Sequence, residues 1–256
     1  MKTIEESIAA AMDFSQDVEI VPFLPYILQD FWELGTPPKI VIDFIQKHCK
    51  NYSALHVLDL GCGKGAVSVK LAQGLQCNCY GIDGIPEFIE SAKEKAKEYG
   101  VETLCRFEVG DIRWKIDALD TFDIIVLGAI GPVFGDYYTT LRKLLKHLTP
   151  EGIVIINDAY IDDSSTFQYQ DILHHLELLH QINQTGMEVI DEYTGKPTNS
   201  TEEFENLQKR CKELIIKYPE KTALLENYVK MQAEAYDALE NSIIGSIMVI
   251  KRCKST

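Results

Sequence analysis

Apolar segments alternate with amphipathic segments through the middle of this chain. Runs rich in apolar and β-branched side chains predict buried strands over residues 55–60, 77–82, 103–109, 122–127 and 153–156. Between them, one-sided apolar stripes predict helices over residues 66–73, 86–99 and 137–147. Strands that alternate with helices in this way favour a parallel sheet that is covered by helices on both faces.

The two outer segments break this rhythm. Residues 1–50 combine aromatic side chains and prolines with a helix expected from Pro38 to His48, and we interpret them as a helical arm. The arm either completes the core or forms a lid over a substrate pocket. Residues 51–256 then form the main domain.

Beyond Ile161 we expect a helix over 166–181 and two strands, over 187–193 and 241–251. A long segment with helical periodicity separates the two strands, and we interpret it as an insertion at about 198–240. The insertion is a packing subdomain, a dimer face or a substrate cap that closes together with the arm.

A glycine-rich stretch follows the first predicted strand. From Leu55 to Gly65 it reads Leu-His-Val-Leu-Asp-Leu-Gly-Cys-Gly-Lys-Gly, an apolar run that ends in an acid and three alternating glycines. Glycines let a ligand approach the backbone closely, and the next helix would point its free N–H groups at that ligand. The carboxylate of Asp59 would repel a diphosphate, whereas it would attract a ligand with a cationic end.

Acidic residues end the next two predicted strands as well. Asp83 comes about twenty residues after the glycine loop, where a carboxylate can accept the hydroxyl hydrogens of a ribose. Asp111 follows Gly110 at the end of the third strand. Because the carboxyl ends of parallel strands share one edge of the sheet, these residues predict a single nucleoside-binding crevice.

The order of these motifs resembles that of the class I S-adenosylmethionine (SAM) dependent methyltransferases. The resemblance covers about residues 50–160 and includes Asp59 ahead of the glycines, Gly110-Asp111, and Pro150-x-Gly152 before the fifth strand. It implies a three-layer, doubly wound, Rossmann-like α/β sandwich. Its seven-stranded sheet would be mainly parallel with an antiparallel last strand, and the outer segments would add a helical cap.

The resemblance also implies SAM as cofactor and S-adenosylhomocysteine (SAH) as product. In the family, the acid at the place of Asp111 approaches the adenine, and Ile112 would pack on its ring. The cofactor-binding residues that the resemblance implies are Asp59, Gly61, Cys62, Gly63, Gly65, Asp83, Gly84, Gly110, Asp111, Ile112 and Gly128.

The expected function is transfer of the SAM methyl group to an acceptor, for which a small molecule is favoured. One alternative is a SAM- or nucleotide-binding protein without catalysis. The other is an NAD(P)-dependent oxidoreductase, since Gly61-x-Gly63-x-x-Ala66 also satisfies the dinucleotide fingerprint. Such an oxidoreductase would have to tolerate Asp59 beside a diphosphate.

Fewer residues in the sequence indicate where the methyl acceptor would bind. Asp158 and Tyr160, just past the fifth strand, are the candidates to remove a proton from an acceptor, and catalytic residues are otherwise unassigned. Tyr26, Phe31 and Trp32 of the arm are candidates for a substrate pocket in which an aromatic face meets the sulfonium.

Composition narrows the possible partners. The net charge of −14 disfavours a nucleic-acid partner, which needs a basic face. The first residues lack the apolar core of a secretion signal, and no run is long enough for a membrane span, so we expect no membrane partner. A homodimer through the cap helices is possible.

Seven scattered cysteines are expected to be reduced thiols in a cytoplasmic protein. Cys77 and Cys79 have no second pair at zinc spacing. The pair Asn157-Asp158 resembles metal-dependent O-methyltransferases, but those also need an acid where Gly128 lies. We therefore expect no metal site.

Overall fold

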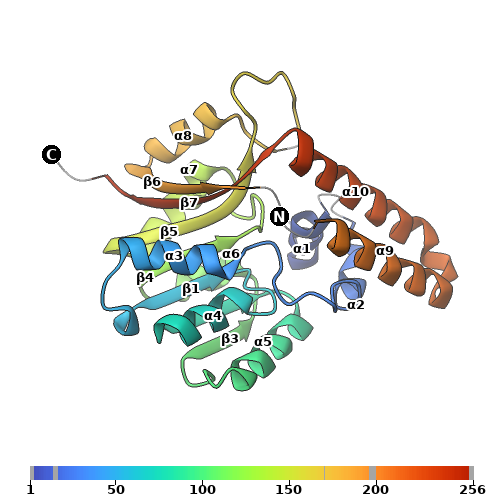
Figure 1. Cartoon of the computed structure of the whole chain (residues 1–256), viewed down its shortest axis with the longest axis horizontal. Helices are drawn as coiled ribbons and strands as arrows, with labels where there is room; N and C mark the ends of the chain where they lie inside the picture. The colour runs from blue at the N-terminus through green and yellow to red at the C-terminus, as the bar shows by residue number, and fades with distance from the viewer. Residues whose placement is uncertain (1–2, 14–16, 170, 196–199, 254–256) are drawn as a thin grey trace.

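Seven strands form one sheet in the computed structural model, which describes residues 3–13, 17–169, 171–195 and 200–253 (Figure 1). The strand order is β3-β2-β1-β4-β5-β7-β6. All pairs are parallel except those of β7, which runs antiparallel to both of its neighbours. The strands are β1 (His56–Leu60), β2 (Asn78–Asp83), β3 (Cys105–Val109), β4 (Phe122–Gly128), β5 (Leu148–Tyr160), β6 (Met187–Thr194) and β7 (Ile244–Arg252). The predicted doubly wound fold is confirmed.

Helices cover both faces of the sheet, because neighbouring strand residues point to opposite sides and both sides are apolar. Val57 of β1 packs in one core cluster and Leu58 in the other. One face carries α3 (Pro38–His48), α4 (Ala66–Leu75) and α5 (Pro86–Glu98), and the other carries α6 (Ile112–Lys115), α7 (Tyr137–Leu144) and α8 (His175–Asn183). Short 3-10 helices are η2 (Tyr52–Ala54), η3 (Ile116–Ala118) and η4 (Leu145–His147).

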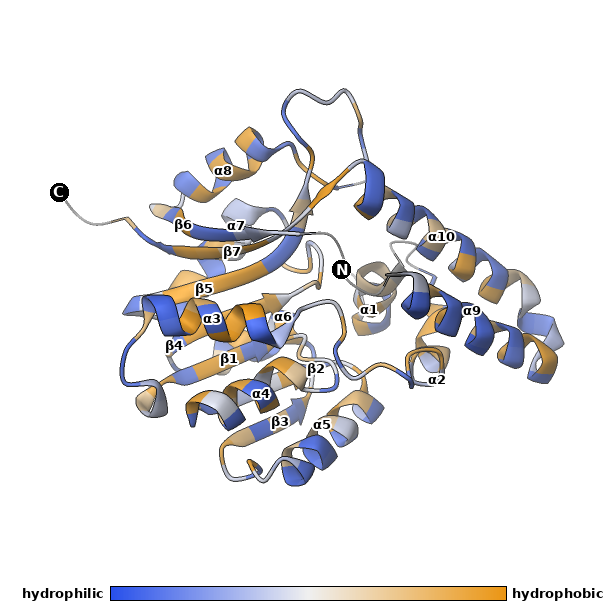
Figure 2. Cartoon of the chain, viewed as in Figure 1, coloured by the Kyte–Doolittle hydropathy of each residue, from blue (hydrophilic) through white to orange (hydrophobic). Residues whose placement is uncertain are grey.

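The two outer segments meet beyond one end of the sheet, on the right of Figure 1. The arm contributes α1 (Ile4–Asp13), η1 (Val18–Phe23) and α2 (Leu24–Ile27), and the insertion contributes α9 (Ser200–Lys217), η5 (Pro219–Lys221) and α10 (Thr222–Asn241). Both segments share one apolar cluster, in which Leu24 of the arm, Leu207 of α9 and Tyr228 of α10 are buried together with Phe88 of α5. Figure 2 shows apolar residues along these helices as well as in the sheet.

Two boundaries differ most from the sequence prediction. The helix expected over 166–181 begins only at His175, because Phe167 and Tyr169 pack in an irregular segment against a cluster with Ile161. Strand β5 begins at Leu148, so the turn expected before Ile153 lies within the strand. A register irregularity in the pairing of β4 with β5 accommodates this extension.

Among the helices that the structure describes, none has the length and apolar character needed to cross a membrane.

Candidate functional site

The glycine loop joins the end of β1 to the first turn of α4. Gly61, Gly63 and Gly65 have positive φ angles of 73°, 51° and 74°, a conformation that residues with side chains rarely adopt. Gly65 is also the N-cap of α4 and offers no side chain to cap it, whereas the Ser68 N–H of the first turn is hydrogen-bonded to Asp59. The loop therefore lies at the carboxyl edge of the sheet, where the N–H groups of Gly61 and Cys62 donate to the Ile82 carbonyl at 2.8 and 3.1 Å.

Two buried carboxylates lie against this loop. The Gly63 N–H donates to Asp83 Oδ2 at 2.9 Å, and the Ile85 N–H donates to Asp83 Oδ1 at 2.9 Å. The Ser68 hydroxyl of α4 donates to Asp59 Oδ2 at 2.6 Å. The structure thus brings together the loop and the two acids that the sequence placed at the ends of β1 and β2.

Burial raises the pKa of both carboxyls. Asp59 is 2% exposed, and desolvation raises its pKa to about 6. The hydrogen bond from Ser68 opposes this rise, whereas the charge of Asp83 adds to it. Burial also raises the pKa of Asp83 against the effect of backbone N–H donors. Since the groups that stabilise these charges are hydroxyl and N–H dipoles and not cations, the pair favours a ligand that brings positive charge.

Asp111 lies at the end of β3 and caps α6. The Arg113 N–H donates to Asp111 Oδ1 at 2.9 Å, and the Arg113 guanidinium pairs with Oδ2 at 2.6 Å. The neighbouring Ile112 side chain is buried in the core cluster with Leu58 and Leu60. Its packing on an adenine ring stays a prediction; α6 starts at Ile112, and the side chain lies in the core.

Cys62 and the remaining glycines have packing roles in this structure. Cys62 is buried, and its sulfur would lie 2.8 Å from a methyl group added to Gly81 of β2. A methyl group on Gly110 would meet the Lys115 side chain at 2.7 Å. These residues therefore allow close packing at the carboxyl ends of β1, β2 and β3.

Apolar side chains of the arm lie directly over the predicted cofactor residues. A methyl group added to Gly84 would lie 2.7 Å from Ile8 Cδ1, and one added to Gly63 would lie 3.3 Å from Leu34 Cδ1. The arm therefore covers both the carboxyl end of β2 and the glycine loop. A ligand against these glycines requires Ile8 and Leu34 to move.

The tip of β4 covers the loop from the other side. Ala129 has a φ of 56°, which costs on the order of 1–2 kcal/mol for a residue with a side chain. The next residue, Ile130, occupies the space into which a side chain on Gly61 would project. Asn157 of β5 donates to the Thr36 hydroxyl at 2.9 Å and so ties the end of the arm to this tip. Backbone strain of this kind is common where a loop is held in place for a function.

A tyrosine–aspartate pair lies at the end of β5. The Tyr137 hydroxyl of α7 donates to Asp158 Oδ2 at 2.7 Å, and the Ala159 N–H donates to Oδ1 at 2.8 Å. Burial raises the pKa of both Asp158 and Tyr137. Sequence reasoning missed Tyr137, because this contact depends on how α7 packs beside β5. Its position as the first residue of a predicted helix after β4 was the available signal.

The other predicted acceptor-side residues have different surroundings. Tyr160 is buried and stacks on His175 with ring centroids 4.3 Å apart. Trp32 donates its indole N–H to the Lys64 carbonyl at 2.9 Å and packs on Tyr99, the C-cap residue of α5. Tyr26 is 40% exposed and donates to a glutamate of α9. The shielding role expected for Tyr26, Phe31 and Trp32 stays a prediction.

In the part of the chain that the structure describes, no group of three or more His, Cys, Asp or Glu side chains is arranged to hold a metal ion. The sulfur atoms of Cys77 and Cys79 lie 3.8 Å apart, and both are free thiols.

Comparisons with known proteins agree with this geometry. A family model described as a methyltransferase domain matches residues 51–246. The ubiquinone biosynthesis O-methyltransferase of Rickettsia canadensis is 27% identical over 171 residues, which cover 58% of this chain and 69% of that protein. An uncharacterized methyltransferase of Bacillus subtilis, YcgJ, is 26% identical over 153 residues, which cover 60% of this chain and 59% of that protein. The chain thus spans little more than half the length of the second relative.

A solved structure supports the fold over nearly the whole chain. The SAM-dependent methyltransferase from Geobacter sulfurreducens, crystallised in complex with SAH, superposes with a TM-score of 0.74 at 17% identity. The superposition covers 91% of this chain and 98% of that chain. It therefore extends beyond the domain matched by the family model and into the arm.

Proposed function

We propose that this chain, which belongs to the family of SAM-dependent methyltransferases, transfers the methyl group of SAM to a small-molecule acceptor. The methyltransferase family predicted from the sequence is confirmed, and the fold shared with an SAH-bound methyltransferase supports SAM as the cofactor. The observation that carries the proposal is the pair of buried acids, Asp59 and Asp83, against a backbone-lined loop. The sulfonium and ammonium of SAM would offset their charge, whereas a dinucleotide would add a diphosphate.

The residues of the crevice fit this cofactor. Each Asp83 oxygen accepts one backbone hydrogen bond and keeps capacity for a ribose hydroxyl. The N-terminus of α4, where the N-cap Gly65 supplies no side chain, can bind the carboxylate of the methionine part. We assign Asp111 to the adenine end, because it lies at the end of the neighbouring strand β3.

When bound, SAM supplies an electrophilic methyl group on a sulfonium. The chain contributes alignment and exclusion of water, for which Ile8, Leu34 and Ile130 are placed at the crevice. Holding an acceptor roughly 3–3.5 Å from the methyl carbon could lower the barrier by about 7–11 kcal/mol. Alignment alone can therefore account for much of the expected rate.

We propose Asp158 as the group that accepts a proton from the acceptor, with Tyr137 holding its carboxylate in place. This role favours acceptors with an O–H or N–H group. Asp158→Asn should lower kcat about a hundredfold and leave SAM affinity unchanged. Because burial raises the pKa of Asp158, wild-type activity should begin to fall, on acidification, at a higher pH than an ordinary aspartate would give. An unchanged rate and pH profile in Asp158→Asn would exclude this role.

The test of the proposed function is SAH formation from SAM with a panel of small hydroxyl and amine acceptors. The proposal expects SAH formation with at least one of them, dependent on Asp158. SAM binding without SAH formation across the panel would favour the non-catalytic alternative.

We also propose that the arm and the helices α9 and α10 form a lid and cap, and that α9 and α10 mediate a homodimer. Ile216 of α9 is 81% exposed, which supports such an interface. Light scattering should give a dimer mass for the wild type and a monomer mass for Ile216→Glu.

A cytoplasmic location stays a prediction, supported by the free state of the cysteines.

A further inference from the structure

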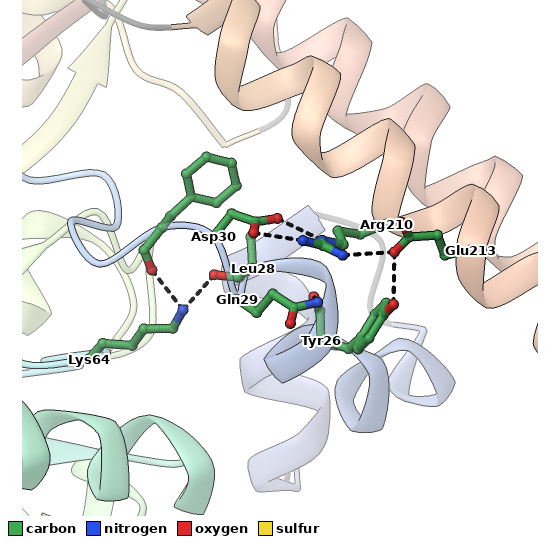
Figure 3. Close-up of polar contacts among 8 residues, drawn as sticks. Tyr26, Leu28, Gln29, Asp30, Lys64, Arg210 and Glu213 are labelled. Atoms are coloured by element: carbon green, nitrogen blue, oxygen red, sulfur yellow. Dashed lines mark hydrogen bonds and ion pairs between the residues drawn. The ribbon is translucent and has the colours of Figure 1, made fainter.

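The arm segment from Tyr26 to Trp32 lies between the glycine loop and α9 and is bonded to both (Figure 3). On the loop side, Lys64 Nζ donates to the carbonyl oxygens of Leu28 at 2.5 Å and Phe31 at 2.7 Å. The Trp32 indole N–H donates in the opposite direction, to the Lys64 carbonyl. Both the side chain and the backbone of Lys64 are therefore attached to the arm.

On the other side, Arg210 of α9 holds the same segment. Its Nε and Nη2 donate to the two carboxylate oxygens of Asp30 at 2.6 and 2.7 Å. Its Nη1 donates to Glu213 at 2.9 Å, and Glu213 also accepts the Tyr26 hydroxyl at 2.7 Å. A bidentate pair of this kind fixes orientation as well as distance. Asp30 thus attaches the segment to α9 at a position between Leu28 and Phe31, the two residues that bind Lys64.

Burying the charged side chain of Lys64 is unfavourable if the residue serves only for packing. Its side chain is buried, with the residue 7% exposed, and its ammonium contacts the two carbonyl oxygens and lies 5.6 Å from the centroid of the Phe88 ring. Among the residues that the structure describes, no carboxylate forms an ion pair with it. Burial lowers its pKa to about 8, and the nearby charge of Asp30 only partly offsets this effect. An apolar side chain would fill the same space without burying a charge. The three N–H donors at the end of the flexible lysine side chain, by contrast, can bind two carbonyl groups of the arm segment.

Lys64 is itself part of the glycine loop. It stands between Gly63 and Gly65, whose positive φ angles place the loop backbone against the crevice. A ligand that fixes the backbone of Gly63 must also fix Lys64, and through it Leu28 and Phe31. The clamp by Arg210 then extends the constraint to α9.

We propose that Lys64 is a positioning residue that couples binding at the glycine loop to the placement of the cap, through the arm segment Tyr26–Trp32 and the Asp30–Arg210 pair. The inference rests on the proposed function, because it takes SAM or SAH as the ligand of the loop. It implies that the acceptor side of the crevice is completed only after the cofactor binds.

Hydrogen–deuterium exchange of the full chain, with and without saturating SAH, tests the coupling. In the wild type, SAH should slow exchange about tenfold in the loop, in residues 24–36 and in α9. In Lys64→Met, SAH should slow exchange in the loop but not in residues 24–36 or α9. Lys97→Met, which changes an exposed lysine of α5, is the matched control and should behave as the wild type.

Arg210→Met provides a second test that does not depend on the folding of Lys64→Met. Protection by SAH should then reach residues 24–36 and stop before α9, and a charge swap, Asp30→Arg with Arg210→Asp, should restore it. Wild-type protection of α9 in both single variants would overturn the coupling and leave the proposed function intact. A wild-type chain that does not bind SAH would overturn both.

Discussion

The carboxyl of Asp59 is buried beside the glycine loop, and its pKa of about 6 lies above the value of about 3.9 for an unfolded aspartate. Between these two pH values the folded state binds more protons than the unfolded state, so stability falls as the pH rises through this window. Above pH 6 the loss is on the order of 2–3 kcal/mol. The residue that we assign to the attraction of SAM is therefore one that weakens the ligand-free fold.

Asp59→Asn should separate these two effects. The variant should melt at a higher temperature than the wild type at pH 7.5, and its melting temperature should change less between pH 4 and 6. It should also bind SAM about tenfold more weakly, which corresponds to about 1.4 kcal/mol. Thermal melts across pH and titration calorimetry give both values, with the exposed Asp120→Asn as control. A variant that melts lower at pH 7.5 and binds SAM as the wild type does would contradict this account of Asp59.

Two glycines allow a controlled test of the glycine loop as the cofactor site. Gly61 and Gly131 both have positive φ, so Gly→Ala should strain the backbone at each by roughly 1–2 kcal/mol. A methyl group on Gly61 would also clash with Ile130, whereas one on Gly131 would meet open space. Only Gly61→Ala should therefore lose SAM binding, measured by calorimetry. Equal affinities in the two variants would argue against the loop as the cofactor site.

Elements marked by local signals could be predicted from the sequence. Pro38 and Pro86 start helices α3 and α5, and the glycines after β1 adopt the predicted backbone conformation. The acids at strand ends could be placed because parallel strands share an edge. What the sequence could not give depends on packing between distant segments. The start of α8, the burial of Ile112 and the contact of Tyr137 with Asp158 all follow from tertiary neighbours.

The packing partners of the arm side chains also could not be predicted from the sequence. Aromatic residues indicated that the arm packs on something, but not on what. Trp32 packs beside α5 and Tyr26 bonds to α9, whereas the residues over the glycines are the aliphatic Ile8 and Leu34. Periodicity and composition do not distinguish these faces.

At the scale of the whole molecule, the two outer segments meet over the carboxyl ends of the central strands. The arm and α9–α10 share an apolar cluster that also includes Phe88 of α5. The outer segments therefore pack on the helix that follows β2. The central claim is that the crevice beneath this cap binds SAM and not a dinucleotide.

Titration calorimetry of the full chain with SAM, SAH and NAD tests that claim most directly. One SAM or SAH should bind per chain, and NAD should give no heat of binding. Binding of NAD without binding of SAM or SAH would contradict it.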